Sequence, residues 1–141
     1  GTPQIAGTFG INYFNKMWFV NLNVNGFGRN YIEIAPMRRL ASNYEGITPV
    51  SPEYGAYKSL TNQERFGSAY TVDLSIGKVF YLKNRNSINF NFAVNNLFNR
   101  ENIKTGGYEQ GRLDTSFPDK FNSKYYYMQG INCFLNASYR F

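Results

Sequence analysis

The side chains able to do chemistry in this chain are limited in kind. The sequence has no histidine and a single cysteine, Cys133. Triads that use histidine, histidine metal sites and internal disulfides are therefore excluded. No carboxylate pair, nucleophile with a neighbouring base, or cluster with metal-ligand spacing is identifiable. We accordingly expect no catalytic residue, no bound metal, no cofactor and no enzymatic activity.

The remaining candidates are cationic and aromatic side chains in two long polar stretches, residues 30–66 and 99–124. They are Arg38, Arg39, Tyr44, Tyr54, Tyr108 and Arg112. Guanidinium groups donate hydrogen bonds to polar ligands, and tyrosine rings stack on sugars or other planar faces. We interpret these residues as contacts to a ligand or to a lid protein. The alternatives are solvated or mutually paired loop charges, each pair contributing little, and ordinary packing of the tyrosines.

Composition restricts the class of protein. The 141 residues are enough for one domain or part of one, with 43% hydrophobic, 18% aromatic and 17% charged residues. Disordered chains are rich in charge and poor in aromatics, so disorder is not expected. No window approaches the roughly 18 consecutive apolar residues of a spanning helix. The net charge is +6, but the basic residues are scattered, so we expect no nucleic-acid partner. Residues 1–4 do not read as a secretory signal.

The elements that must position the polar stretches are strands, because apolar and polar residues alternate along much of the chain. Alternation predicts strands at about residues 5–13, 17–28, 68–81, 87–98 and 125–141. In the second of these, Trp18, Leu22 and their alternate neighbours form one face, and Asn21 and Asn23 belong to the other. Asparagine is depleted in ordinary strands. Rows of asparagine are easier to accommodate in a polar, water-filled lumen.

Short and long connections alternate between these strands. Residues 14–16 and 82–86 read as short turns, and residues 30–66 and 99–124 as long extracellular loops. This asymmetry is typical of outer-membrane barrels, with turns in the periplasm and loops outside. We therefore predict an all-β, up-and-down antiparallel segment of a transmembrane β-barrel. Since known single-chain barrels have at least about eight strands, further strands must complete the wall.

The last predicted strand carries a distinctive end. Phe141, Tyr139 and Leu135 share its apolar face. This pattern resembles the terminal strand of a bacterial outer-membrane barrel, whose final aromatic is part of the signal read by the barrel-assembly machinery. We expect these three residues to form that assembly signal.

Two motifs resemble one family. Residues 92–99 read FAVNNLFN, which is similar to the NLF segment near the C-terminus of TonB-dependent outer-membrane receptors. Residues 105–110, TGGYEQ, with Arg112 and Asp114 and with SKYYY at 123–127, resemble the last extracellular loop of Bacteroidetes-type members. The ending SYRF agrees. The whole chain then resembles the C-terminal part of such a receptor, the last five of the family's roughly 22 barrel strands.

The resemblance implies a function in transport. Family members import scarce nutrients such as iron chelates, cobalamin, glycans or peptides across the bacterial outer membrane. The implied partners are the rest of the barrel and its plug, TonB through an N-terminal region, the barrel-assembly machinery, outer-membrane lipid and a surface lipoprotein lid. Two alternatives stay open. One is a fragment of a non-transport outer-membrane barrel or adhesin, and the other is a secreted all-β carbohydrate-binding sandwich.

Overall fold

The chain forms two compact units in the computed structural model, which describes residues 2–114, 116–117 and 120–141. We call them the sheet unit and the loop unit. The sheet unit consists of residues 5–28, 68–103 and 128–141. The loop unit consists of the described residues of 1–4, 29–67 and 104–127. Each unit is therefore built from stretches that are far apart in the sequence.

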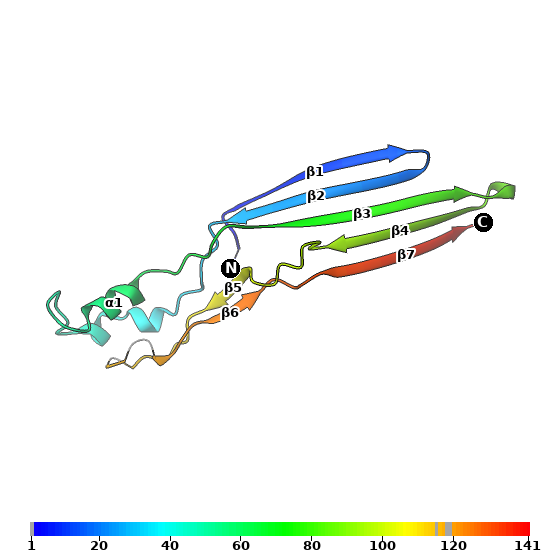
Figure 1. Cartoon of the computed structure of the whole chain (residues 1–141). Helices are drawn as coiled ribbons and strands as arrows, with labels where there is room; N and C mark the ends of the chain where they lie inside the picture. Colours follow the sequence, from blue (N-terminus) through cyan, green and yellow to red (C-terminus); the bar gives the residue numbers. More distant parts are fainter. Residues whose placement is uncertain (1, 115, 118–119) are drawn as a thin grey trace. The chain divides into compact units, whose positions relative to one another are not determined.

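The sheet unit is a five-stranded antiparallel sheet in the order β1-β2-β3-β4-β7 (Figure 1). Its strands are β1 (Ile5–Asn15), β2 (Trp18–Gly28), β3 (Ala69–Tyr81), β4 (Ser87–Asn95) and β7 (Asn132–Arg140). Each strand lies beside the one before it in this sheet, so the predicted all-β, up-and-down antiparallel architecture is confirmed. Within the described residues, β1 and β7 each pair on one side only, and the sheet is not closed.

The register assembles one continuous apolar face. Antiparallel partners project to the same side of a sheet, and the pairs connect into rows that cross it. One row joins Ile11, Leu22, Leu74, Val94 and Cys133, and the next joins Tyr13, Val20, Ile76, Phe92 and Leu135. A slip of one residue would move a strand's apolar set to the other side.

The opposite face is largely polar, and two of its asparagines, Asn25 and Asn91, have cross-strand side-chain partners. Asn25 Nδ2 donates to Asp73 Oδ2 at 2.6 Å, and Thr8 Oγ1 donates to Asn25 Oδ1 at 2.9 Å. Ser75 Oγ donates to Asn91 Oδ1 at 3.0 Å. These side-chain hydrogen bonds explain how strands tolerate a residue type that strands usually avoid.

The short turns join successive strands. The β1–β2 turn is Lys16–Met17, with φ of 45° and 63° and with Asn15 paired to Trp18. Two left-handed residues give the twist that a two-residue hairpin requires. The turn therefore lies slightly later in the chain than the turn predicted at 14–16, because β1 continues through Asn15. The β3–β4 connection contains the 3₁₀-helix η3 (Lys83–Arg85) and closes with Leu82 N donating to Asn86 O at 2.8 Å.

β4 ends three residues before the predicted boundary at 98, because Asn96 turns away from the strand. Asn96 is buried and has a φ of 52°. Its backbone N donates to Asp73 Oδ1 at 2.9 Å. Its side-chain Nδ2 donates to Gln129 O at 2.9 Å and to Arg100 O, and its Oδ1 accepts from Arg100 N at 3.0 Å. One side chain thus fixes the backbone on both sides of this bend.

The single strand predicted at 125–141 is wrong. The structure has two strands there, β6 (Lys124–Tyr127) and β7, with residues 128–131 outside both. β6 pairs with β5 (Lys104–Tyr108), a strand inside the stretch expected to be a loop at 99–124. Thr115, Pro118 and Asp119 of that stretch lie outside the described residues. Between β6 and β7, Met128 N donates to Ile103 O and Ile131 N donates to Asn99 Oδ1, so sheet pairing is interrupted.

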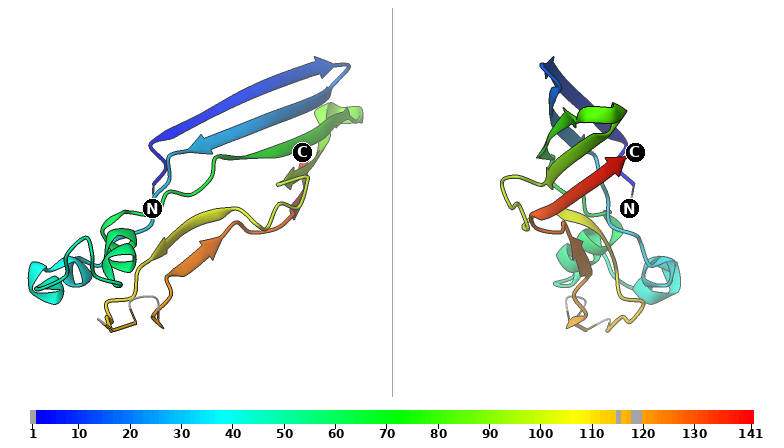
Figure 2. Two further views of the ribbon diagram at one scale, coloured as in Figure 1. Left: turned by 60° about the vertical axis from the view of Figure 1, so that its left-hand side comes forward. Right: turned by 90° about the vertical axis from the view of Figure 1, so that its right-hand side faces the viewer.

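The loop unit contains helices in residues 30–66, where the sequence predicts a long loop. Residues 30–66 include the 3₁₀-helices η1 (Pro36–Arg39) and η2 (Ala41–Tyr44) and the α-helix α1 (Tyr54–Thr61) (Figure 2). Bridges pair Tyr31 with Arg65 and Glu33 with Tyr108. Ile32, with 1% of its surface exposed, is among its buried residues. Of the described helices, none has the length and apolar character to cross a membrane.

We expect Asn96→Ala to lower the free energy of unfolding by roughly 1–3 kcal/mol, because it leaves three part-buried backbone groups without their partners. Denaturant unfolding of the folded full-length protein, followed by circular dichroism, measures this change. Asn95→Ala is the matched control, since Asn95 is the exposed neighbour at the end of β4. Equal stability of the two variants would show that Asn96 does not fix the bend.

Candidate functional site

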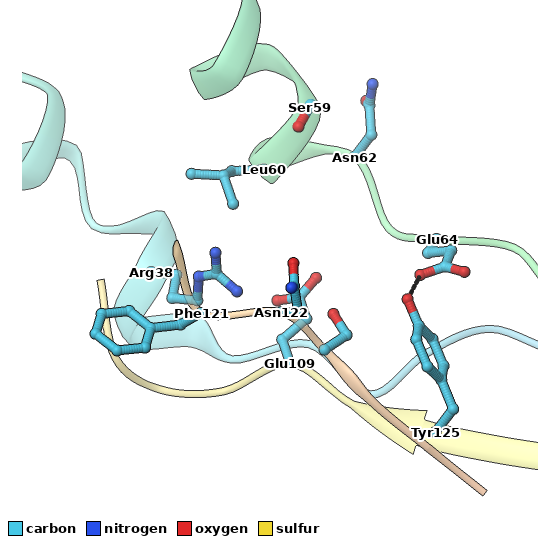
Figure 3. Close-up of a pocket in the computed structure, with 10 residues that line it drawn as sticks. Arg38, Ser59, Leu60, Asn62, Glu64, Glu109, Phe121, Asn122 and Tyr125 are labelled. Atoms are coloured by element: carbon cyan, nitrogen blue, oxygen red, sulfur yellow. Dashed lines mark hydrogen bonds between the residues drawn. The ribbon is translucent and has the colours of Figure 1, made fainter. Parts of the chain in front are cut away.

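The loop unit contains an open, largely polar pocket of about 520 Å³ (Figure 3). Arg38 of η1 and residues at the end of α1 contribute to its wall. Glu64, Glu109, Asn122 and Tyr125 also line it. Carboxylate, guanidinium, amide and phenol groups are thus gathered around one space. Such a lining can both donate and accept hydrogen bonds from a polar ligand.

A cluster of tyrosines supports η1. Tyr44 is buried, and its hydroxyl donates to Arg38 O. The Tyr44 ring lies 4.2 Å from the ring of Tyr57 on α1, and Tyr57 lies 6.4 Å from Tyr54, between ring centroids. Burial raises the pKa of the Tyr44 hydroxyl, so it is held protonated and remains a donor. The cluster therefore connects η2, which contains Tyr44, and α1, which contains Tyr54 and Tyr57, to the backbone of Arg38 in η1.

Arg39 and Glu109 form a bidentate ion pair. Arg39 Nη2 donates to Glu109 Oε1 at 2.7 Å, and Nη1 donates to Oε2. Ala35 N donates to the same Oε2 at 3.0 Å. Burial disfavours the charged carboxylate, but these hydrogen bonds outweigh it and lower the pKa of Glu109. The two side chains are only 17% and 10% exposed, so the pair is better shielded than a typical surface pair.

A second charged cluster consists of Glu64, Lys104 and Tyr125. Lys104 Nζ donates to Glu64 Oε1 at 2.9 Å, and Tyr125 Oη donates to Oε2 at 2.7 Å. Lys104 Nζ also lies 3.6 Å from the centroid of the Tyr125 ring, a cation–π distance. Burial opposes the ionised form of Glu64, but the hydrogen bonds from Lys104 and Tyr125 lower the pKa of its carboxyl. The hydrogen bond to Glu64 raises the pKa of Tyr125.

The structure does not bring the six predicted contact residues together in the pocket, although Arg38, Arg39, Tyr44 and Tyr54 belong to η1, η2 and α1, which the tyrosine cluster connects. Of Arg38, Arg39, Tyr44, Tyr54, Tyr108 and Arg112, only Arg38 lines this pocket. Tyr108 on β5 lies beside the Tyr126 ring at 6.2 Å, and the Arg112 guanidinium lies 5.9 Å from the Phe121 ring. Mutual pairing of loop charges, the alternative interpretation, applies to Arg39. The roles of the six in ligand or lid binding remain predictions.

Sequence reasoning missed the amides in the pocket, Asn62 and Asn122, because nothing in their local pattern distinguishes them. From the sequence, Glu64 and Glu109 are acidic residues of the two polar stretches, without any sign of their partners. Their cationic partners lie 40 and 70 residues away along the chain. No periodicity or motif joins residues at such separations, so only the folded chain identifies them as a group.

The predicted assembly residues lie on or beside β7. Leu135 and Tyr139 belong to the apolar face and are 70% and 54% exposed, and Phe141 is 96% exposed. The Tyr139 hydroxyl accepts a hydrogen bond from Asn86 Nδ2 at 2.7 Å. All three side chains are therefore accessible to a partner.

Comparison with protein-family models, curated proteins and solved structures finds no match to this chain. Within the part of the chain that the structure describes, no group of three or more Cys, Asp or Glu side chains is arranged to hold a metal ion.

The lowered pKa values of Glu64 and Glu109 predict that the loop unit becomes less stable in acid. The ordinary value of these carboxyls is 4.5, and folding lowers it for Glu64 and Glu109. Their stabilisation is complete above the ordinary value and is lost as pH falls through the lower, folded values. We therefore expect residues 30–66 and 104–127 to lose hydrogen-exchange protection in acid, after correction for intrinsic exchange.

Glu109→Gln should destabilise the loop unit at neutral pH by roughly 1–3 kcal/mol, since a charge-assisted pair is lost, and should weaken its acid dependence. Glu53→Gln is the control, because Glu53 is an exposed acid of the same unit. A loop unit equally protected at all pH values, or equally affected by both substitutions, would contradict this account.

Proposed function

We propose that this chain is the C-terminal barrel segment of a Bacteroidetes-type TonB-dependent receptor in the bacterial outer membrane. It supplies transmembrane wall, extracellular loops and an assembly signal to a protein that imports a scarce nutrient: an iron chelate, cobalamin, a glycan or a peptide. The single observation that carries the proposal is the uncovered apolar face of the five-stranded sheet.

That face is too apolar and too exposed for a water-facing surface. Phe9 and Leu135 are 68% and 70% exposed, and the central Phe90 is 44% exposed. In a soluble sandwich such residues pack against a second sheet about 10 Å away. A large exposed apolar patch is instead typical of a membrane or protein interface. Hydrocarbon contact across all five strands is the arrangement that a barrel wall requires.

The polar face and the connections support the same proposal. Hydrogen-bonded asparagine, serine and threonine side chains suit a water-filled or plugged lumen. β1–β2 and β3–β4 are joined by short turns, whereas residues 29–68 and 96–131 make the long connections. We assign the turns to the periplasm and the long connections to the cell exterior. Unpaired strand edges are not tolerated in hydrocarbon, so β1 and β7 would pair with further strands of the barrel.

The loop unit then lies outside the cell, where it contributes to nutrient capture or to contact with a surface lipoprotein lid. Arg38, Arg39, Tyr44, Tyr54, Tyr108 and Arg112 remain our candidates for these contacts. The plug and TonB would act through the rest of the receptor. Leu135, Tyr139 and Phe141 are our candidates for the surface that the barrel-assembly machinery reads.

The alternatives make different predictions. A non-transport barrel or adhesin would lack a plug and a TonB-binding segment in its full-length protein. A secreted carbohydrate-binding sandwich would stay soluble without detergent and would bury Leu74 and Phe90 inside a single chain. Uncovered Phe90 disfavours the sandwich.

Charged substitutions on the two faces test membrane exposure. We expect Leu74→Arg to destabilise the inserted barrel by roughly 2–4 kcal/mol, the cost of arginine near the bilayer midplane. Ser75→Arg is the matched control, because this neighbouring side chain lies on the polar face. Heat-modifiable mobility of the full-length protein in isolated outer membranes measures insertion. Normal insertion of Leu74→Arg would argue against lipid contact.

Trp18 provides a direct measurement, since it is the only tryptophan of this chain and belongs to the apolar face. In vesicles of brominated phosphatidylcholine we expect its fluorescence, taken as the difference between the parent protein and Trp18→Phe, to be strongly quenched. Phe19→Trp in the Trp18→Phe background places the ring on the polar face and should be quenched much less. Equal quenching at positions 18 and 19 would contradict the assignment of faces.

A further inference from the structure

The apolar face has a groove near its short turns. It has a volume of about 320 Å³ and is lined by Trp18, Ile76, Phe80, Phe90, Phe92 and Leu135, with Lys78 among them. Lys78 is paired between Trp18 and Phe90 in one row. A cation among large aromatic residues on a largely apolar face requires an explanation.

The Lys78 ammonium has two ring contacts and, among the residues that the structure describes, no hydrogen-bond acceptor. Its Nζ lies 4.5 Å from the Trp18 ring and 4.8 Å from the Phe80 ring, between Nζ and ring centroid. No hydrogen bond or ion pair joins it to another described residue. An ammonium has three N–H donors. The two rings therefore hold its position and leave its donors available for an anion.

Charge in the sheet unit is strongly asymmetric. Its cations at the turn end are Lys16, Lys78, Lys83, Arg85 and Arg140, placed by the β1–β2 turn, the β3–β4 turn and their neighbouring strand ends. Its only acidic side chains are those of Asp73 and Glu101, which belong to the other end of β3 and to the segment after β4. Asp73 already accepts hydrogen bonds from Asn25 and Asn96. The turn end therefore favours a negatively charged partner.

We propose that this groove binds an anionic glycerophospholipid, such as phosphatidylglycerol, in the periplasmic leaflet. An acyl chain would lie against Trp18, Phe90 and Leu135, and the headgroup phosphate would accept hydrogen bonds from Lys78. The other turn-end cations would favour a net negative headgroup over a zwitterionic one. A lysine three residues from the end of β3 can extend to the headgroup level while its stem stays in hydrocarbon. This site rests on the barrel proposed above.

The test uses the full-length protein in neutral detergent. Native mass spectrometry measures the apparent dissociation constant of the first bound phosphatidylglycerol and of the first phosphatidylcholine. We expect tighter binding of phosphatidylglycerol. Lys78→Gln should weaken it about fivefold, the contribution of one lysine at a charged membrane surface, and Lys78→Arg should largely retain it.

Arg100→Gln is the matched control. Arg100 makes a comparable cation–π contact, 4.4 Å from the Tyr70 ring, but lies away from the turn end. Its removal should leave phosphatidylglycerol binding unchanged. If Lys78→Gln fails to fold, the double change Lys83→Gln and Arg85→Gln in the exposed β3–β4 turn should still reduce the preference for phosphatidylglycerol.

Equal affinity for the two lipids, or no effect of any turn-end substitution, would overturn the proposal. Displacement of phosphatidylglycerol by millimolar inorganic phosphate would identify a free-anion site and would also overturn it. In each of these cases the parent protein would still insert into phosphatidylcholine vesicles as a heat-modifiable barrel, so the proposed function would stand. Failure of the parent protein to insert at all would instead count against the proposed function.

Discussion

The cross-strand register of the five-stranded sheet is the constraint on which the rest of the sheet unit depends. It places apolar side chains from every strand on one side and hydrogen-bonded amides on the other. Because side chains alternate with a period of two, no intermediate arrangement exists. Close packing on the polar face reinforces this register. Phe19 lies over Gly77, where an added Cβ would come to 1.9 Å from the ring, so any larger residue at position 77 would displace the ring.

The end of β4 shows how a polar side chain can end a strand without leaving backbone groups unsatisfied. Asn96 adopts a left-handed conformation, for which asparagine is better suited than most residues, and serves three backbone groups with one amide. Asn99, also left-handed, accepts from Ile131 N, and Gly130 leaves room for it: a Cβ there would lie 2.6 Å from Asn99 Oδ1. Asn96 and Asn99 of the NNLFN segment thus each have a structural reason, independent of any resemblance.

Alternation located the five strands of the main sheet because one-sided apolar patterning is local information. It failed where pairing depends on distant backbone. Residues 104–108 contain Gly106 and Gly107, which weaken strand propensity, yet they pair with β6. The aromatic run 125–127 read as the start of the last strand, but contacts from Ile103 and Asn99 interrupt it. The pocket was still less predictable, since Arg39 and Glu109 meet only through tertiary structure.

The two units are stabilised by different physical interactions. The sheet unit relies on backbone pairing and on what covers its apolar face; in the barrel proposed above, its stability would depend on lipid or detergent. The loop unit relies on Glu64 and Glu109, each neutralised by a cation from a distant segment, so its stability should depend on pH and salt. Both carboxylates line the pocket and already have cationic partners outside its lining, so a ligand that displaces Arg39 or Lys104 would loosen the unit. A ligand that hydrogen-bonds to the amides and hydroxyls of the pocket wall would leave these two ion pairs intact.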